Sequence, residues 1–477
     1  MISALAQEIV TLVILLASGY AGAFLLGAKS IAHAVSLGLG LSVMWRVVSH
    51  SLLYLIGMGN YSQMVWLIGS LIVMVLAIAL ELKSKSLWLG IGISTLVGLV
   101  SGIATRGLGL RGIEHSDSLW IMTLSDLMQR NGDLEILGGR TAIKRGFSYP
   151  LTLALGPEGS SLTGLTVMIY LALVIAIIWA AMRLAPRLSV RQWAIFLLPL
   201  GLVLATAPIV FRAIWYVNGH TLTALGVVLG VTAVVLSIRE GSLSRIHLVT
   251  LMIGLALIST TRPEGIAFAA LIAAPLLQQR WISRLDIRLI VFSALGSFGL
   301  WIYVYDGYVA TPLRLYDERF PIAMVLASVL VGFKIFDWFR FRLVALAFIS
   351  MGLITTFMVV SNFSSLQDDF LAQFQNMFLG QGFWGGFFIF CLVALFVIGL
   401  RQMSPSYRLL LTISALLFLG SVMAKLLDGG FFGDPTLGRL GWTDSLNRMW
   451  LQSFGIFALT VIIGYAESVT KKVKSLV

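Results

Sequence analysis

Apolar runs of about 20 residues recur along almost the whole chain, with short polar stretches between them. A run of that length lets an α-helix cross the hydrocarbon core of a bilayer. Only a helix satisfies its own backbone hydrogen bonds in that environment. The pattern therefore predicts an all-α, polytopic transmembrane protein with about 13 to 15 spans. We expect the spans near residues 9–28, 31–57, 63–81, 87–105, 163–182, 193–211, 219–238, 247–260, 265–277, 289–305, 320–334, 343–360, 385–400, 409–427 and 447–466.

One long polar segment, residues 106–162, interrupts this pattern. It holds six of the 21 acidic residues of the chain: Glu114, Asp117, Asp126, Asp133, Glu135 and Glu158. Because the chain is otherwise short of carboxylates, this segment is where we expect chemistry.

Two stretches outside the predicted spans show helical periodicity with one apolar face, which predicts amphipathic helices lying on the membrane surface. The apolar positions in residues 118–130 are Trp120, Leu124, Leu127 and Met128. Those in residues 366–378 are Leu366, Phe370, Phe374 and Phe378.

Composition excludes a soluble globular protein, because 58% of the residues are hydrophobic and only 11% are charged. Soluble domains carry about 25% charged residues. The residues before the first apolar run lack a basic region, so we expect no cleavable signal peptide. Cys391 is the single cysteine, which argues against disulfides and cysteine metal sites.

The net charge of +12 could indicate nucleic-acid binding, but its distribution indicates a membrane orientation signal instead. Alternate loops hold 19 of the 33 lysine and arginine residues: Lys29, Lys83, Lys85, Arg183, Arg187, Arg191, Arg239, Arg245, Arg280, Arg284, Arg288, Lys334, Arg340, Arg342, Arg401, Arg408, Lys471, Lys472 and Lys474. Such loops face the cytoplasm. We therefore expect the C-terminus inside and residues 106–162 outside, with the lipid bilayer and not nucleic acid as partner.

Asp117 leads the acid-rich segment, just before the predicted surface helix. It could cap that helix, or accept a proton from a hydroxyl as a general base. Glu114 lies three residues earlier and could be the base instead. The two roles of Asp117 do not exclude each other.

Ionisable residues within or beside membrane spans are functional candidates, because they are costly there. Thr261-Arg262-Pro263-Glu264-Gly265 breaks an apolar run, and Arg262 with Glu264 could line a cavity or form a structural clamp. Arg212 and His220 flank a predicted turn at Gly219 and could line a polar cavity or belong to a capped hairpin. Arg448, beside Asn447 at the start of the last span, could bind substrate or snorkel to the interface. Arg46 and His50 share one helical face and could pair with another helix.

Together these pieces resemble the GT-C superfamily of membrane glycosyltransferases that use polyprenyl-phosphate sugars. The matching pieces, in chain order, are Asp117-Ser118-Leu119-Trp120, Asn131-Gly132-Asp133, Tyr149-Pro150-Leu151, Thr261 to Gly265, and Asn447-Arg448-Met449. Ser118 stands where the family often has a second acidic residue. Three predicted spans also precede the helix that would be the family's first.

The resemblance implies extra transmembrane helices over residues 1–86, a catalytic module over 87–305 and a C-terminal transmembrane region over 306–477. It implies an inverting glycosyltransferase that moves a sugar from a polyprenyl-phosphate donor to a hydroxyl of a lipid, glycan or protein. Asp117 or Glu114 would be the base. The substrate-binding residues would be Arg448, Asn447, Arg262, Glu264, Arg212, His220 and Tyr149. No metal or other cofactor is expected, because arginine can neutralise a lipid-phosphate leaving group.

A transporter or flippase of a lipid-linked saccharide is an alternative, because broken helices with charge pairs also occur in transporters. A transporter has no need of a long acidic outer loop. A ligase-like or polymerase-like enzyme acting on lipid-linked sugars is a third interpretation, in which arginine and histidine replace the leading carboxylate.

The alternation of basic loops predicts that Ser160 and Ser86 lie on opposite sides of the membrane. Single cysteines placed at each position should react with a membrane-impermeant maleimide from opposite sides of sealed vesicles, Ser160 from outside. Labelling of both cysteines from one side would contradict the predicted orientation.

Overall fold

The computed structural model of the protein describes residues 2–110, 116–130, 146–157, 160–185, 188–262, 264–308, 342–361, 363–398, 404–432 and 448–474. Within these ranges the chain forms helices and no β-strand. Eight of the described helices are long and apolar enough to cross a membrane, and five shorter apolar helices accompany them. The prediction of an all-α, multi-pass membrane protein is therefore confirmed, whereas the total number of spans and their orientation stay predictions.

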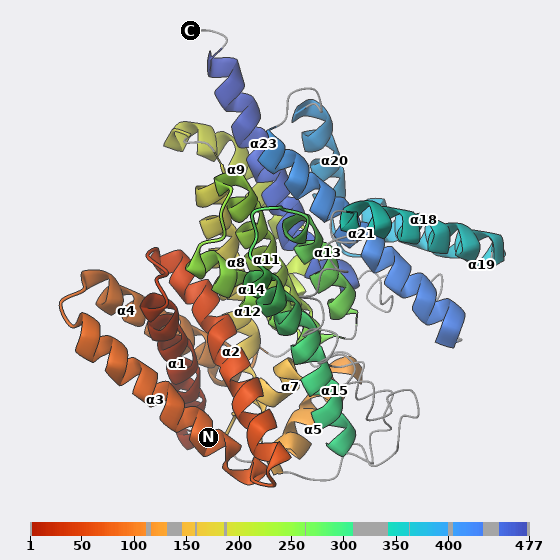
Figure 1. The fold of residues 1–477 in the computed structure, drawn as a ribbon. Helices are drawn as coiled ribbons and strands as arrows, with labels where there is room; N and C mark the ends of the chain where they lie inside the picture. Colours follow the sequence, from red (N-terminus) through yellow and green to blue (C-terminus); the bar gives the residue numbers. More distant parts are fainter. Residues whose placement is uncertain are drawn as a thin grey trace.

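The first four helices form one group, drawn in red and orange in Figure 1. They are α1 (Ile2–Leu25), α2 (Ile31–Leu55), α3 (Ser62–Glu81) and α4 (Lys85–Gly102), and α1 packs against the other three. A π-helical turn, η2 (Ile103–Gly107), continues α4. Much of the surface of α3 and α4 is exposed and apolar, as expected for helices that face lipid.

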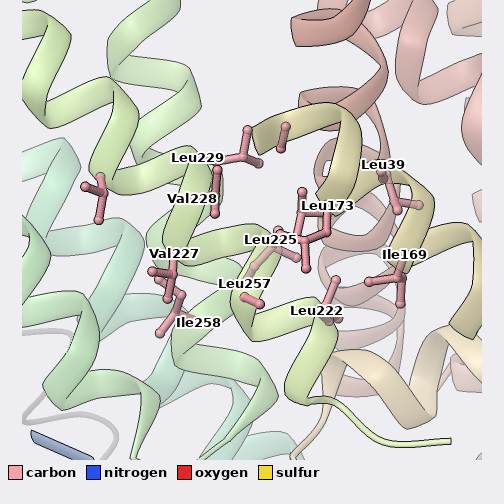
Figure 2. Close-up of a cluster of buried hydrophobic side chains, with 14 of the residues drawn as sticks. Leu39, Ile169, Leu173, Leu222, Leu225, Val227, Val228, Leu229, Leu257 and Ile258 are labelled. Carbon is pink, nitrogen blue, oxygen red and sulfur yellow. The ribbon is translucent and has the colours of Figure 1, made fainter. Parts of the chain in front are cut away.

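Helix α11 (His220–Glu240) lies at the centre and is buried from His220 to Ser237. It packs against α8 (Gly164–Leu184), α12 (Arg245–Thr261) and α13 (Gly265–Leu277). Figure 2 shows its contact with α2, α8 and α12 through Leu39, Ile169, Leu173, Leu222, Leu225, Val227, Val228, Leu229, Leu257 and Ile258.

The approach of α11 to α12 depends on two facing glycines. A Cβ added to Gly226 would lie 2.8 Å from the carbonyl oxygen of Gly254, and one added to Gly254 would lie 2.7 Å from that of Gly226. Membrane helices associate through close van der Waals packing, and small residues permit that contact. The glycine pair therefore sets the distance between the two helices whose ends carry the candidate site described below.

Among the described residues, eleven further helical segments follow α8 in the chain, and some of them contact α11. They are α9 (Val190–Ala205), α10 (Pro208–Arg212), α14 (Arg284–Val291), the π-helical turn η4 (Phe292–Gly296), α15 (Ser297–Tyr308), α18 (Leu343–Ser361), α19 (Phe363–Phe378), α20 (Phe387–Ile398), α21 (Pro405–Phe432), the 3₁₀ turn η7 (Trp450–Gln452) and α23 (Phe454–Lys474). Helix α23 packs against α8, α20 and α21. Figure 1 shows α23 extending away from the group of four N-terminal helices.

Two predicted spans differ in extent from the helices of the structure. The span expected near 193–211 is two helices, because α9 ends at Ala205 and α10 begins at Pro208. Proline lacks the amide hydrogen needed inside a helix but is well suited to its first position. The span expected near 289–305 is longer and runs from Arg284 through a π-helical turn to Tyr308. The span expected near 320–334 lies outside the described residues.

The predicted surface helix in the polar segment is α5 (Ser116–Arg130), which begins two residues before the expected Ser118. Asp117 is therefore its second residue rather than its N-cap. One face of α5 packs against the short helix α7 (Ser148–Leu153). The buried positions are Ser118, Ile121, Leu124, Ser125 and Met128, so the buried face is rotated slightly from the predicted stripe.

Candidate functional site

Four segments that are far apart in the sequence meet around the N-terminal end of α11. They are residues 146–149, residues 216–220, the break between α12 and α13, and residues 448–452. The backbone amide of Phe147 donates to the Thr260 carbonyl at 2.9 Å. The hydroxyls of Ser148 and Thr261 lie 2.9 Å apart. The chain that leaves the polar segment is thereby attached to the end of α12.

Gly146 makes this attachment possible. Its φ of +78° is in the left-handed region, which a residue with a side chain rarely adopts. A Cβ at this position would also collide with the Thr261 carbonyl oxygen. Both observations require glycine where residues 146–149 approach α12.

The break between α12 and α13 is produced by the local sequence. Arg262 ends α12 in an extended conformation, with φ −148° and ψ 146°. This is the conformation favoured by a residue that precedes proline. The Gly265 amide then donates to the Arg262 carbonyl at 2.9 Å and starts α13. Arg262 Nε lies 3.0 Å from Glu264 Oε1, and the two side chains are only 13% and 15% exposed.

Gln452 connects this charge pair to α11. Its Nε2 lies 3.2 Å from Glu264 Oε1 and 2.9 Å from His220 Nδ1. An ionised carboxylate can only accept hydrogen bonds, so the Gln452 atom that faces it must be the amide nitrogen. The same nitrogen then donates to His220 Nδ1, which requires a neutral imidazole with its hydrogen on Nε2. The geometry thus assigns both an amide orientation and a histidine tautomer.

A second set of hydrogen bonds connects His220 to Arg448, which precedes the last helix. The His220 backbone amide donates to Asn218 Oδ1 at 3.2 Å, and Asn218 Nδ2 donates to the Tyr216 hydroxyl at 3.2 Å. Arg448 also donates to that hydroxyl, at 3.3 Å. We call the whole chain of contacts the polar network; its members are Arg262, Glu264, Gln452, His220, Asn218, Tyr216 and Arg448.

Charge in the polar network is arranged to keep Glu264 ionised. Burial acts to raise the pKa of Glu264, whereas the Arg262 guanidinium and hydrogen bonds from Arg262 and Gln452 act to lower it. The lowering prevails, and the pKa of Glu264 lies below its ordinary value. The named members of the polar network include two guanidinium groups, which can bind an anionic ligand through charge-assisted hydrogen bonds.

The polar network also contains a buried acceptor that no described protein group uses. Gln452 is fully buried, and its Oε1 has no hydrogen-bond partner among the described residues. A buried acceptor of this kind is costly to leave unsatisfied. A hydroxyl group of a bound molecule would complete its hydrogen bonding.

The structure brings four of the predicted site residues together. Arg262, Glu264, His220 and Arg448 belong to the polar network. Arg448 is only 7% exposed, so it is not a side chain snorkelling at the surface. Glu114 and Asn447 lie outside the described residues.

Tyr149 lies beside Asn218 and Tyr216 of the polar network, whereas Arg212 contacts a residue outside it. The Tyr149 side chain is fully buried, and its hydroxyl lies 2.6 Å from Thr166 Oγ1 of α8. The Arg212 guanidinium lies over the Phe383 ring, 5.2 Å from its centre. Arg46 and His50, for which pairing with another helix was one interpretation, both contact Ser62 of α3.

Sequence reasoning missed Gln452, which joins the charge pair to His220. The available signal was its position four residues after Arg448, on the same helical face. No group of three histidine, cysteine, aspartate or glutamate side chains among the described residues is arranged to hold a metal ion. Comparisons with protein-family profiles, with curated proteins and with solved structures found no match.

The lowered pKa of Glu264 predicts a pH-dependent contribution to stability. A carboxyl group whose folded-state pKa is depressed stabilises the protein above its ordinary pKa, here 4.5, and loses that contribution as pH falls through the folded-state value. At pH 7, Glu264→Gln should therefore lower the free energy of unfolding by about 3 kcal/mol, because Arg262 loses its buried partner. The measurement is thermal or denaturant unfolding of the purified protein in detergent.

The difference in the free energy of unfolding between wild type and Glu264→Gln should become smaller as pH falls below 4.5. Glu81→Gln, the same substitution at an exposed carboxylate of α3, is the matched control and should change little. A deficit for Glu264→Gln that is constant across this pH range would show that ionisation of Glu264 does not stabilise the fold.

Proposed function

We propose that the protein is an inverting membrane glycosyltransferase of the GT-C kind. Its donor would be a polyprenyl-phosphate sugar, and its acceptor a hydroxyl group on the extracytoplasmic side. The polar network is the observation that carries this proposal. It joins the Arg262–Glu264 pair of the broken helix to Arg448 before the last helix, although the two segments are separated by almost 190 residues.

The network has the chemistry that a lipid-phosphate donor needs. A guanidinium group grips two phosphate oxygens at once, and its charge becomes more stabilising as the leaving group gains negative charge. Arg448 and Arg262 would provide this interaction. Gln452 Oε1 would accept a hydrogen bond from a sugar hydroxyl, because it is buried and has no described partner.

The proposed reaction uses one carboxylate as a general base. The acceptor hydroxyl gives its proton to Asp117, in the first turn of α5, and its oxygen forms a bond to the anomeric carbon. The bond between that carbon and the phosphate oxygen breaks, and its electron pair leaves with the polyprenyl phosphate. Attack from the face opposite the leaving group inverts the anomeric centre. Glu114 is the alternative base.

A transporter or flippase of a lipid-linked saccharide is the second candidate, and the charge pair at the break between α12 and α13 favours it equally. The two functions differ in their product. Purified protein should be incubated with a panel of polyprenyl-phosphate sugars and hydroxyl acceptors, and release of polyprenyl phosphate should be measured. Movement of the intact donor across vesicles without release would favour transport.

Asp117→Asn should lower turnover by about 10²- to 10⁴-fold, the usual effect of removing a positioned acid–base group. Donor binding should change little, because the base contacts the acceptor. Asp126→Asn, the same change in the same helix, is the matched control, and Glu114→Gln should be milder than Asp117→Asn. Loss of transfer in Glu114→Gln but not in Asp117→Asn would exchange their roles, and full activity in both would contradict the proposal.

Arg448→Ala should weaken polyprenyl-phosphate binding by about 1.5–3 kcal/mol, the usual range for a hydrogen bond to a charged group. Arg448→Lys should recover only part of this loss, because an ammonium group lacks the planar fork of a guanidinium. Binding should be measured in detergent at one ionic strength, with Arg183→Ala, a half-exposed arginine of α8, as control. Equal affinity in wild type and both Arg448 variants would exclude Arg448 as the phosphate ligand.

A further inference from the structure

The first helix contains a buried carboxylate that the proposed reaction does not use. Glu8 lies in the second turn of α1, and its side chain is completely buried. Ionised side chains inside a membrane-embedded bundle are costly unless they are paired and hydrogen-bonded. The partners of Glu8 therefore indicate why it is there.

Those partners come from both ends of the polar segment. Glu8 Oε2 forms an ion pair and hydrogen bond with Arg106 Nε in η2. Glu8 Oε1 accepts from the Gly164 amide at 2.7 Å and from the Thr163 hydroxyl at 3.1 Å. Gly164 is the first residue of α8, where the helix dipole favours a negative charge. The Glu8 carboxylate thus connects the first residue of the polar segment 106–162 to the two residues that follow the segment.

Arg106 extends this contact toward α5. Its Nη2 atom donates to the Ser160 hydroxyl at 2.6 Å and to the Ser161 carbonyl at 3.3 Å. The Ser161 hydroxyl donates to Ser125 of α5 at 3.4 Å. A path of contacts therefore runs from Glu8 to the helix that contains Asp117.

A second contact holds α5 one turn further along, near its C-terminal end. The side-chain amide of Gln129 donates to the carbonyls of Gly156 and Pro157, at 2.8 and 3.3 Å. These carbonyls belong to the same returning stretch that Arg106 holds at Ser160 and Ser161. The position of α5 thus depends on a stretch that is fixed to α1 through Arg106 and Glu8.

We propose that Glu8 and Arg106 are positioning residues that fix the position of α5. Through them the first helix would contribute to the placement of the catalytic base. This inference rests on the proposed function for its effect on turnover, but its structural content can be tested without activity. Glu8→Gln removes the negative charge that faces Arg106. The glutamine presents to Arg106 either an uncharged carbonyl oxygen or an amide nitrogen, which is itself a donor. Arg106→Lys keeps the positive charge but loses the fork that reaches Glu8 and Ser160 together.

The experiment measures distances between spin labels by pulsed electron paramagnetic resonance in the full-length protein, with Cys391 replaced by alanine. One label is placed on exposed Leu119 of α5 and the other on exposed Phe211 of α10. A control pair joins Phe211 to exposed Met58, in the turn between α2 and α3. Turnover and donor KM are measured on the same variants without labels.

In Glu8→Gln and in Arg106→Lys the Leu119–Phe211 distance distribution should broaden or shift, while the Met58–Phe211 distribution stays that of the wild type. Turnover should fall by about 10- to 100-fold, because a displacement of about 1 Å of a catalytic group can cost 10²-fold. Donor KM should stay within about twofold, because the donor ligands belong to the polar network. Glu81→Gln, the matched control, should change none of these quantities.

An unchanged Leu119–Phe211 distribution in a folded variant would overturn the inference. Changes in both label pairs together would also overturn it, because they would indicate a general loss of packing. If Glu8→Gln does not fold, Arg106→Lys, which keeps the buried charge paired, decides the matter. A selective change in the α5 distance in a protein without transferase activity would support the positioning role and contradict the proposed function.

Discussion

A charged group inside a membrane-embedded helical bundle must find a partner of opposite charge or several hydrogen bonds, because no water is available to replace them. This constraint decides where polar side chains gather in the protein. The polar network and the contacts of Glu8 both lie at helix ends or breaks, where backbone groups also lack partners within the helix. Arg262 and Glu264 lie between α12 and α13, and the carboxylate of Glu8 in α1 contacts the first residue of α8. Elsewhere the described helices bury mainly apolar side chains, although Arg46 and His50 of α2 are buried as well and contact Ser62 of α3.

The polar network is attached to the most deeply buried part of the fold. Helix α11 is enclosed along nearly its whole length, and His220 at its first position joins the network to that core. Facing glycines hold α11 against α12, whose end carries Arg262. A site attached in this way has little freedom to rearrange, which is what stabilisation of charge by fixed groups requires.

The N-terminal helices are more closely joined to the rest of the chain than the predicted boundary at residue 86 suggests. Helix α2 packs against α7, α8 and α12, and Arg46 of α2 donates to the Leu151 carbonyl. Glu8 of α1 joins η2 to α8. The predicted division of the chain stays a prediction, but these contacts show that residues 1–86 support the segment in which we expect the catalytic base.

Most helices and the break after α12 could be predicted from the sequence because they are local properties. The break before Pro208 is equally local but was not predicted. The length of an apolar run or the glycine after Glu264 acts within one or two turns, and most predicted helices agree with the structure within a few residues. The neighbouring pair Arg262 and Glu264 could be found for the same reason. Gln452 and Glu8 could not be found in this way, because their partners lie about 100 to 230 residues away in the sequence. Hydrophobic periodicity identifies which face of a helix is buried but not which helix covers it. Only the packing of α1, α8, α11 and α12 decided which polar side chains would meet.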